Sequence, residues 1–387
     1  MWLGPFSIVL KSIQIKQPCE PNADFRVIRA ENRTYFNGGE PMKAGLKLGE
    51  GAGHFAVQEI EMPTVGDGDV LIQIKAAGVC GADVLIYEWT YRGKRPVMLP
   101  VALGHEGAGV IVEVGKNVKG LKVGDRVTTE AIIGCGSCWF CYRGMPNLCP
   151  YWDHTGNTLH GSMAEYMRVP ATAVHRLPEN VTFEQGALVE PLSIIAHTLD
   201  RVRFSLGDSV VIIGPGTMGL LLTQAARSFG AAQVIVLGLE KDRLRLEKAK
   251  ALGADVIIVA DIKDDDPVQQ VLDLTGGIGA DVVCEVGGTP ESFSMALKMV
   301  RGAGQIAALG YSNYAELEPI TIARKEMSIL GIIASMPRHF EDALRWLQYG
   351  KVKPETIVSH SLSLDEAEKG IHLMRDKQAT KAVIVIP

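Results

Sequence analysis

Four cysteines between residues 135 and 149 have the type and spacing of metal ligands. They follow the pattern Cys135-x2-Cys138-x2-Cys141-x7-Cys149 in a segment rich in glycine and proline. Four thiolates complete a tetrahedral zinc shell with no position open for a substrate, so the pattern predicts a structural zinc site. An iron–sulfur cluster also uses four cysteines, and metal analysis would separate the two.

A second, scattered set of candidate ligands consists of Cys80, His105, Glu106 and Glu190. Cys80 lies in Gly-Val-Cys-Gly-Ala-Asp, the His-Glu pair in Gly-His-Glu-Gly, and Glu190 in Leu-Val-Glu-Pro-Leu-Ser. Taken singly, each is ambiguous, because a lone Cys is usually a small core residue and a lone His-Glu pair is often part of a hydrogen-bonded turn.

A glycine-rich segment has the features of a dinucleotide-binding turn. Residues 210–213 form a short apolar strand, Gly-Pro-Gly-Thr-Met-Gly follows, and a helix is predicted over residues 220–229. Glycines permit the tight turn and the close approach of a pyrophosphate, and the helix N-terminus offers free N–H groups. The predicted cofactor-binding residues of this segment are Gly214, Gly216, Thr217, Met218 and Gly219.

Residues after the second predicted strand of this unit, 234–237, indicate which nicotinamide cofactor is bound. An acidic residue that holds the ribose hydroxyls is expected about 20 residues beyond the glycines. Gly238 occupies the nearest position, and Glu240 follows two residues later. Glu240 favours NAD, whereas Lys241, Arg243 and Arg245 would suit the extra phosphate of NADP or form a solvated helix face. We therefore expect NAD, with NADP as the alternative.

The elements around these motifs indicate an α/β protein with two folding units. Short apolar strands at residues 210–213, 234–237, 256–259, 282–284 and 306–309 alternate with helices, which predicts a doubly wound parallel sheet. Before them, residues 43–178 are rich in strands and turns, and the tail adds two helices and a strand at 382–386. We expect an extension at 1–42, a catalytic domain at 43–192 and 333–387, and a dinucleotide-binding domain at 193–332.

Composition argues against several classes of partner. The 387 residues carry a formal net charge of -5, which gives no reason to expect nucleic acid and argues against a zinc-ribbon nucleic-acid protein. No apolar run reaches the roughly 18 to 20 residues of a membrane span. The apolar first ten residues lack the flanks of a secretory signal, and seven cysteines, an odd count, suit a reducing compartment. We expect a cytoplasmic protein.

Taken together, the motifs resemble the zinc-containing branch of the medium-chain dehydrogenase/reductase family over residues 43–387. The matching segments are Gly-His-Glu-Gly-Ala-Gly at 104–109, Val-Gly-Asp-Arg-Val at 123–127 and the four-cysteine lobe, in the family's order. The resemblance implies a GroES-like catalytic domain beside a Rossmann domain. It implies Cys80 and His105 as catalytic zinc ligands, Glu106 as a ligand or an exchanging neighbour, and Glu190 at the third protein position.

Within that family, Glu190 indicates the class of substrate. Enzymes for simple primary alcohols usually have cysteine there, and Leu-Val-Glu-Pro-Leu-Ser resembles the sorbitol dehydrogenase branch. Residues 86–89 also resemble threonine dehydrogenases, so an amino alcohol is the second candidate. The usual proton relay is missing, because Ala82 and Leu85 stand where the family has a hydroxyl residue and often a histidine.

The expected reaction transfers hydride from a secondary alcohol, such as a polyol or sugar alcohol, to NAD, with zinc as Lewis acid. Without the usual relay, Glu190, Glu106 or a substrate hydroxyl remain as acid–base candidates. A relative that binds the cofactor without catalysis is the remaining alternative. The family also implies a homodimer or homotetramer.

Overall fold

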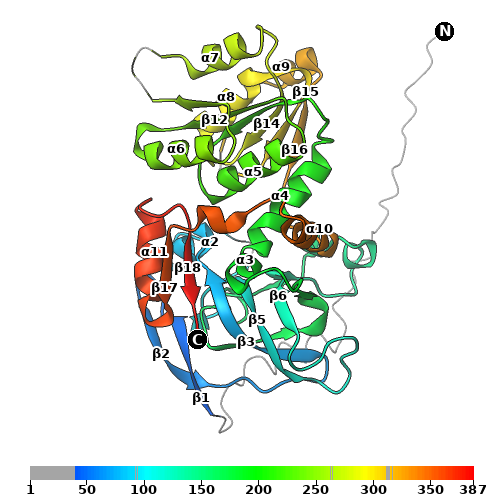
Figure 1. Cartoon of the computed structure of the whole chain (residues 1–387), viewed down its shortest axis with the longest axis vertical. Coiled ribbons are helices and arrows are strands. Elements are labelled where there is room, and N and C mark those ends of the chain that lie inside the picture. Colours follow the sequence, from blue (N-terminus) through cyan, green and yellow to red (C-terminus); the bar gives the residue numbers. More distant parts are fainter. Residues whose placement is uncertain are drawn as a thin grey trace, which may run out of the picture.

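The computed structural model describes residues 40–387, apart from 92, 94, 262, 264, 311–313 and 316. The expected extension at 1–42 therefore falls almost entirely outside the described residues, and its last two positions already belong to the first strand, Pro41–Lys47. Figure 1 shows two units stacked along the long axis, with the β-rich unit below and a layered α/β unit above. No helix among the described residues is long and apolar enough to cross a bilayer.

The β-rich unit is built on two main sheets. One has the order β10-β6-β5-β3-β18-β17, with β9 also paired to β3, and the other has the order β2-β1-β4. The strands are β1 (Pro41–Lys47), β2 (Phe55–Glu61), β3 (Asp69–Gly78), β4 (Val101–Ala102), β5 (Glu106–Val114), β6 (Arg126–Thr129), β9 (Tyr166–Pro170), β10 (Val174–Arg176), β17 (His360–Ser363) and β18 (Ala382–Val385). A short pair, β7 (Ile132–Ile133) with β8 (Asp153–His154), flanks them. The C-terminal strands thus return to the first unit.

The upper unit is a six-stranded parallel sheet in the order β13-β12-β11-β14-β15-β16, with helices on both faces. Its strands are β11 (Ser209–Ile213), β12 (Gln233–Gly238), β13 (Val256–Val259), β14 (Ala280–Glu285), β15 (Val300–Ala308) and β16 (Ser328–Gly331). This order, which reverses at β11, is that of the doubly wound dinucleotide-binding fold. The predicted fold class is confirmed, and β16 is a strand that the sequence pattern did not predict.

Helices cover the sheets and join the two units. They are α2 (Gly81–Tyr87), α3 (Phe183–Ala187), α4 (Val189–Arg201), α5 (Thr217–Ser228), α6 (Arg243–Ala251), α7 (Pro267–Leu274), α8 (Pro290–Met299), α9 (Pro319–Lys325), α10 (Pro337–Gln348) and α11 (Ala367–Arg375). In Figure 1, α4 and α10 lie where the two units meet. The buried face of α4 joins the apolar core that β11 and β12 form with α5, so α4 ties the units together by continuous packing.

His175 on β10 connects the β-rich unit to α10. Its Nε2 lies 2.8 Å from Glu130 and its Nδ1 lies 2.9 Å from Glu341 of α10. The ring also stacks on Phe340, with 4.9 Å between ring centroids. Burial lowers the pKa of His175, but the two carboxylates outweigh burial and raise it above the usual histidine value.

We predict that His175→Gln destabilises the protein by about 2 kcal/mol near pH 6 and by less at alkaline pH. Protonated His175 stabilises the folded protein, because its pKa is raised there. This contribution is complete below the histidine pKa of the unfolded chain, about 6.5, and is lost as the pH rises through the higher pKa of the folded state. Thermal unfolding between about pH 5.5 and about pH 9 measures the difference. His360→Gln is the control, and an equal loss of stability across that range would contradict the prediction.

Candidate active site

The ends of three adjacent strands bring the scattered candidate ligands together. β5 and β18 both run antiparallel to β3, and Gly78 at the end of β3 pairs with Glu106 on one side and Val383 on the other. Cys80 follows β3, Glu106 opens β5, and Lys381 directly precedes β18. Because antiparallel neighbours alternate in direction, these three positions lie at the same end of the sheet.

Cys80, His105 and Glu106 form a group that fits a metal ion. One ligand atom from each lies within 4.8 Å of the other two. His105 and Glu106 are buried and Cys80 is partly exposed, so the group borders on solvent at one side. A sulfur, a nitrogen and a carboxylate oxygen are all common zinc donors, and three protein ligands leave a fourth position open, as catalytic zinc sites do.

Lys381 holds the carboxylate of Glu106 in place. The buried ammonium donates to Glu106 Oε1 at 2.7 Å and to the carbonyl of Val79 at 2.9 Å. Glu106 Oε2 is also buried and lies 2.5 Å from the same nitrogen, so both carboxylate oxygens contact the ammonium. Each carboxylate oxygen has two lone pairs, so an oxygen of Glu106 can contact the ammonium and still offer a lone pair to a metal ion.

Asp83, which the sequence analysis did not select, positions two of the predicted ligands. Its buried carboxylate accepts from the backbone N–H of Cys80 at 2.8 Å and of Gly104 at 3.0 Å, and it lies 3.6 Å from Nδ1 of His105. Burial lowers the pKa of His105, but Cys80 and Asp83 outweigh it and raise the pKa well above 6.5. The surroundings of His105 therefore stabilise positive charge. The sequence signal for Asp83 was an acidic residue three positions after Cys80, in the first turn of α2.

Glu190 lies beside this group and is not part of it. It is buried in the first turn of α4, and its carboxylate is outside the cluster of ligand atoms that lie within 4.8 Å of one another. Burial raises the pKa of Glu190 to about 7, an effect that His105 opposes and Glu106 increases. The structure therefore brings three of the four predicted residues together and places the fourth nearby as a carboxyl group that titrates near neutral pH.

His154 is a second neighbour that the sequence analysis did not select. Its ring lies edge-on to the His105 ring, with 5.0 Å between centroids, and its Nδ1 is 2.5 Å from the carbonyl oxygen of Thr155. Burial lowers the pKa of His154 to about 3, and His105 adds to this effect. Ala82 and Leu85 lie on α2 and offer no proton-carrying group, as the sequence indicated. No motif or spacing in the sequence had related His154 to Cys80, His105 or Glu106.

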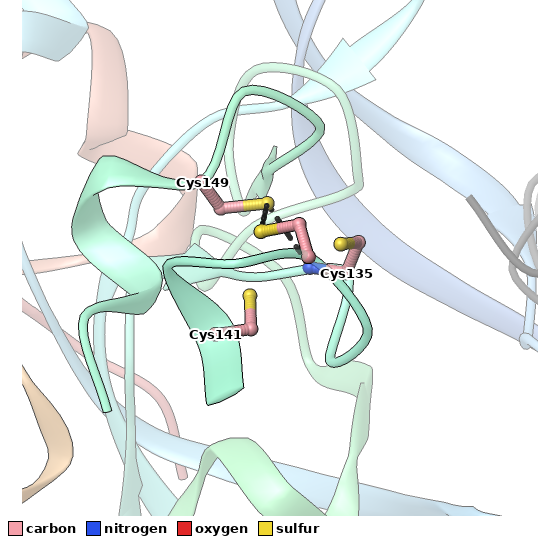
Figure 2. A group of neighbouring side chains, drawn as sticks. Cys135, Cys141 and Cys149 are labelled. Carbon is pink, nitrogen blue, oxygen red and sulfur yellow. Dashed lines mark hydrogen bonds between the residues drawn. The ribbon is translucent and has the colours of Figure 1, made fainter. Parts of the chain in front are cut away.

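The four cysteines of the lobe gather around one point, as Figure 2 shows. Their sulfur atoms all lie within 4.8 Å of one another, and the sulfurs of Cys138 and Cys149 are 3.7 Å apart. Backbone N–H groups of Cys135 and Tyr151 each point at the sulfur of Cys149, at 3.3 Å. Burial raises the pKa of Cys141 to about 11, and the nearby Cys135 adds to it. Thiolates crowded this closely need a cation among them, which fits a closed four-sulfur metal site.

The glycine-rich segment forms the predicted turn between β11 and α5. A Cβ on Gly219 would lie 2.0 Å from the carbonyl oxygen of Gly214, so only glycine permits this close packing of helix and strand. Gly216 caps α5, and a Cβ there would meet nothing within 4 Å. The N-terminus of this twelve-residue helix is therefore open to an anionic group such as a pyrophosphate. Thr217 and Met218 form the first turn of α5, and the Thr217 hydroxyl donates to the carbonyl of Thr380.

Glu240 and Arg245 have different surroundings. Glu240 is exposed after β12 and forms an ion pair with Arg243 at 2.7 Å. Arg245 is buried, and its guanidinium donates to the carbonyl of Ala379 at 2.7 Å. The Glu240 carboxylate is thus accessible to a ligand, whereas the Arg245 guanidinium already binds the C-terminal segment.

We predict that Gly78→Ala weakens metal binding at the Cys80 group by about 10- to 100-fold, as changes around metal ligands do. A Cβ at position 78 would lie 1.9 Å from Glu106 Oε2, so the carboxylate would have to move. Metal content after dialysis against a graded chelator series measures the effect. Gly81→Ala is the control, because a Cβ there meets nothing within 4 Å. Wild-type metal retention in Gly78→Ala would contradict the prediction.

Comparison with known families covers both units of the fold. Residues 66–179 match the alcohol dehydrogenase GroES-like domain, and residues 217–349 match the zinc-binding dehydrogenase domain. A sorbitol dehydrogenase of Halalkalibacterium halodurans is 40% identical over 346 residues, which are 89% of this chain and 99% of that protein. An L-threonine 3-dehydrogenase of Bacillus velezensis is 33% identical over 90% of this chain and 99% of its own length.

Solved structures show the same architecture. An alcohol dehydrogenase from Thermus sp. ATN1 superposes with a TM-score of 0.82 at 32% identity, covering 89% of this chain and 100% of that one. A zinc-binding dehydrogenase of Sinorhizobium meliloti bound to NADP has a TM-score of 0.80 at 29% identity, covering 89% and 99%. A dehydrogenase of Escherichia coli complexed with NADH has a TM-score of 0.81 at 29% identity, covering 90% and 100%. The chain therefore belongs to the zinc-containing medium-chain dehydrogenase family, near its polyol and threonine branch, and is an oxidoreductase that acts on alcohols.

Proposed function

We propose that this protein oxidises a secondary alcohol of the polyol or sugar-alcohol class, with NAD as hydride acceptor and zinc held by Cys80, His105 and Glu106, beside Glu190. The observation that carries the proposal is the Cys80 group itself, in which a thiol, an imidazole and a carboxylate converge beside one partly exposed side. When bound there, zinc would act as a Lewis acid on the alcohol oxygen.

The protein's own residues have separate tasks in this proposal. Asp83 orients His105 and the backbone of Cys80, and Lys381 balances the charge of Glu106. Glu190, whose pKa burial raises to about 7, is the group best suited to accept and release the proton near neutral pH. This assignment fills the place of the usual relay, which Ala82 and Leu85 cannot form.

The preference for NAD rests on Glu240. Its exposed carboxylate follows the second strand of the sheet, where an acidic group binds the ribose hydroxyls in dinucleotide-binding folds. Arg245, one of the three basic residues that would suit NADP, already donates to the carbonyl of Ala379. NADP stays the alternative, because the similar solved structures include an NADP and an NADH complex.

The preference for a polyol over an amino alcohol rests on two features. Glu190 lies in the Leu-Val-Glu-Pro-Leu-Ser segment, and the sorbitol dehydrogenase relative is 40% identical against 33% for the threonine dehydrogenase. A screen of polyols, diols, hydroxy acids and amino alcohols with NAD and NADP, followed by absorbance of the reduced nicotinamide, tests the proposal. Reduction of NAD with polyols or diols supports it. Activity confined to threonine-like substrates, or none with any alcohol, would refute it.

We predict that His105→Ala abolishes alcohol-dependent NAD reduction, with a loss of at least about 1,000-fold, while NADH binding persists. The imidazole is one of three ligands, whereas the glycine-rich turn lies on the other folding unit. Steady-state kinetics and NADH fluorescence titration measure the two properties. His360→Ala serves as the control, and turnover retained in His105→Ala would refute the zinc assignment.

We predict that the Cys135–Cys149 lobe holds a structural zinc, so that the wild type contains about two zinc ions per chain. Cys141→Ser should contain about one and unfold at a temperature lower by several degrees, because structural zinc contributes directly to folding. Atomic emission and thermal unfolding measure both quantities. Cys284→Ser, at a buried cysteine in β14 away from the lobe, controls for loss of a thiol. Iron and labile sulfide in place of zinc would contradict the prediction.

We also propose that the enzyme is cytoplasmic and that it assembles as a homodimer or homotetramer, as the family suggests. Light scattering of the purified protein measures its assembly, and a monomeric mass would refute that part.

A further inference from the structure

A pocket at the junction of the two units carries charged groups that the reaction described above does not use. Its volume is about 450 Å³, and it is formed by the end of α4 with the turn after it, by β15 and β16, and by the first turn of α10. Figure 1 shows α4, α10 and β16 in this region. The polar residues that line this arginine pocket are Asp200, Arg201, Arg203, Gln305, Ser328 and Arg338.

The arginine pocket lies at the opposite end of α4 from the Cys80 group. Glu190 is in the first turn of this helix, and Arg201 is its last residue. At about 1.5 Å of rise per residue, the two positions are roughly 16 Å apart along the helix axis. Ser328 is the first residue of β16, whereas the glycine-rich turn follows the last residue of β11, at the opposite edge of the parallel sheet. A ligand of this pocket would therefore be neither the alcohol nor the dinucleotide.

Positive charge exceeds negative charge in the arginine pocket. Three guanidinium groups line it, and Asp200 is the only carboxylate among the described residues that do so. Asp200 is already paired with Arg338, at 2.8 Å. The side chains of Arg201 and Arg203 form no ion pair or hydrogen bond with any residue that the structure describes. Two positive charges around one cavity thus lack a counter-charge, and an anion in the cavity would supply it.

The backbone that carries these two arginines is well fixed. Val202, which lies between them, is completely buried in the apolar core that joins α4 to the parallel sheet, and its N–H donates to the carbonyl of Thr198 at 3.0 Å. Arg203 has a left-handed backbone, with φ of 43°, which is uncommon for a residue other than glycine. A ligand therefore needs to order only the two side chains and not the chain segment, which lowers the entropic cost of binding.

The chemistry of these groups favours a phosphate as the anion. The planar fork of a guanidinium donates to two oxygens of a phosphate at once, and a phosphate monoester carries about -1.5 to -2 charges at pH 7. That charge matches Arg201 and Arg203 together, whereas one carboxylate would match only one of them. The amide of Gln305 and the hydroxyl of Ser328 also line the cavity and provide further donors.

The size of the cavity favours a phosphate ester over the free phosphate ion. A volume of about 450 Å³ lies within the range of about 300–1,000 Å³ that is typical of pockets for small organic ligands. Leu330 on β16 also lines the cavity and gives it one apolar, partly buried wall. The organic part of an ester would contact this wall, and a free phosphate ion would leave most of the space to water.

We infer that the arginine pocket binds a small phosphate monoester, with Arg201, Arg203 and Arg338 around its phosphate group. This site goes beyond the proposed function and does not depend on it. Because Arg201 ends α4 and Arg338 belongs to α10, the bound anion would join the two helices that lie where the units meet. Binding to the folded state alone would raise the unfolding temperature.

The test is isothermal titration calorimetry with phenyl phosphate, inorganic phosphate and acetate at constant ionic strength. The reduced cofactor, NADH or NADPH, is present in excess, so that the glycine-rich turn is filled, and phenyl phosphate has no alcohol group to oxidise. The wild type should bind phenyl phosphate in a saturable manner and more tightly than inorganic phosphate, with no binding of acetate. Arg201→Gln combined with Arg203→Gln should weaken the binding of phenyl phosphate by at least about 10-fold.

Lys298→Gln combined with Arg324→Gln is the matched control, because it removes the same net charge from exposed positions on α8 and α9 that do not line the pocket. This variant should bind phenyl phosphate as the wild type does. Arg203→Lys keeps the charge without the planar fork and should give an intermediate affinity. Thermal unfolding without ligand shows whether each variant is folded.

Three results would overturn the inference. The first is no binding of phenyl phosphate by the wild type, or binding of inorganic phosphate alone. The second is unchanged affinity in the folded variant that lacks both arginines, which would place the anion elsewhere, for example at the Cys80 group. The third is an equal loss in the matched control, which would reveal an effect of net charge only. Each of these results leaves the oxidation of alcohols untouched, because that activity is measured separately.

Discussion

The buried ion pair of Glu106 and Lys381 is the interaction on which the rest of the site depends. Both side chains are almost fully withdrawn from solvent, and removing one partner of such a pair costs about 3–5 kcal/mol, because the other charge stays buried. Three strands meet at one end of the sheet to form it, and Gly78 leaves room for the carboxylate. The pair keeps the carboxylate of Glu106 buried and charged beside Cys80 and His105, which is what makes the group suitable for a metal ion.

The same C-terminal segment connects this ion pair to the cofactor-binding unit. Within residues 377–381, Lys377 pairs with Asp242 at 3.0 Å, the carbonyl of Ala379 accepts from Arg245, and the carbonyl of Thr380 accepts from Thr217. The next residue is the lysine that holds Glu106. The glycine-rich turn and the group of Cys80, His105 and Glu106 are therefore positioned against each other through five consecutive residues, in addition to the packing of α4.

Much of the fold followed from periodicity, and the exceptions have physical causes. Four apolar strands of the parallel sheet were predicted to within two residues at each end, because buried parallel strands form continuous apolar runs, whereas β15 begins at Val300, six residues before its predicted start. β16 escaped prediction because its four residues, Ser328–Gly331, are partly or fully exposed at the sheet edge and carry only two apolar side chains. Asp83 and Lys381 were overlooked as site residues, since a charged residue that pairs with a distant partner looks like any surface charge in one sequence.

The sequence by itself determined the features whose residues are close neighbours in the chain. The four-cysteine lobe spans fifteen residues and the glycine-rich turn six, so spacing alone restricts their geometry. Only the tertiary structure decided which distant side chains meet. It joined Cys80, His105 and Glu106, left Glu190 beside them, and paired Glu106 with a lysine 275 residues away. Strand pairing across the sheet depends on how whole elements pack, and residue spacing within a single segment contains no record of that packing.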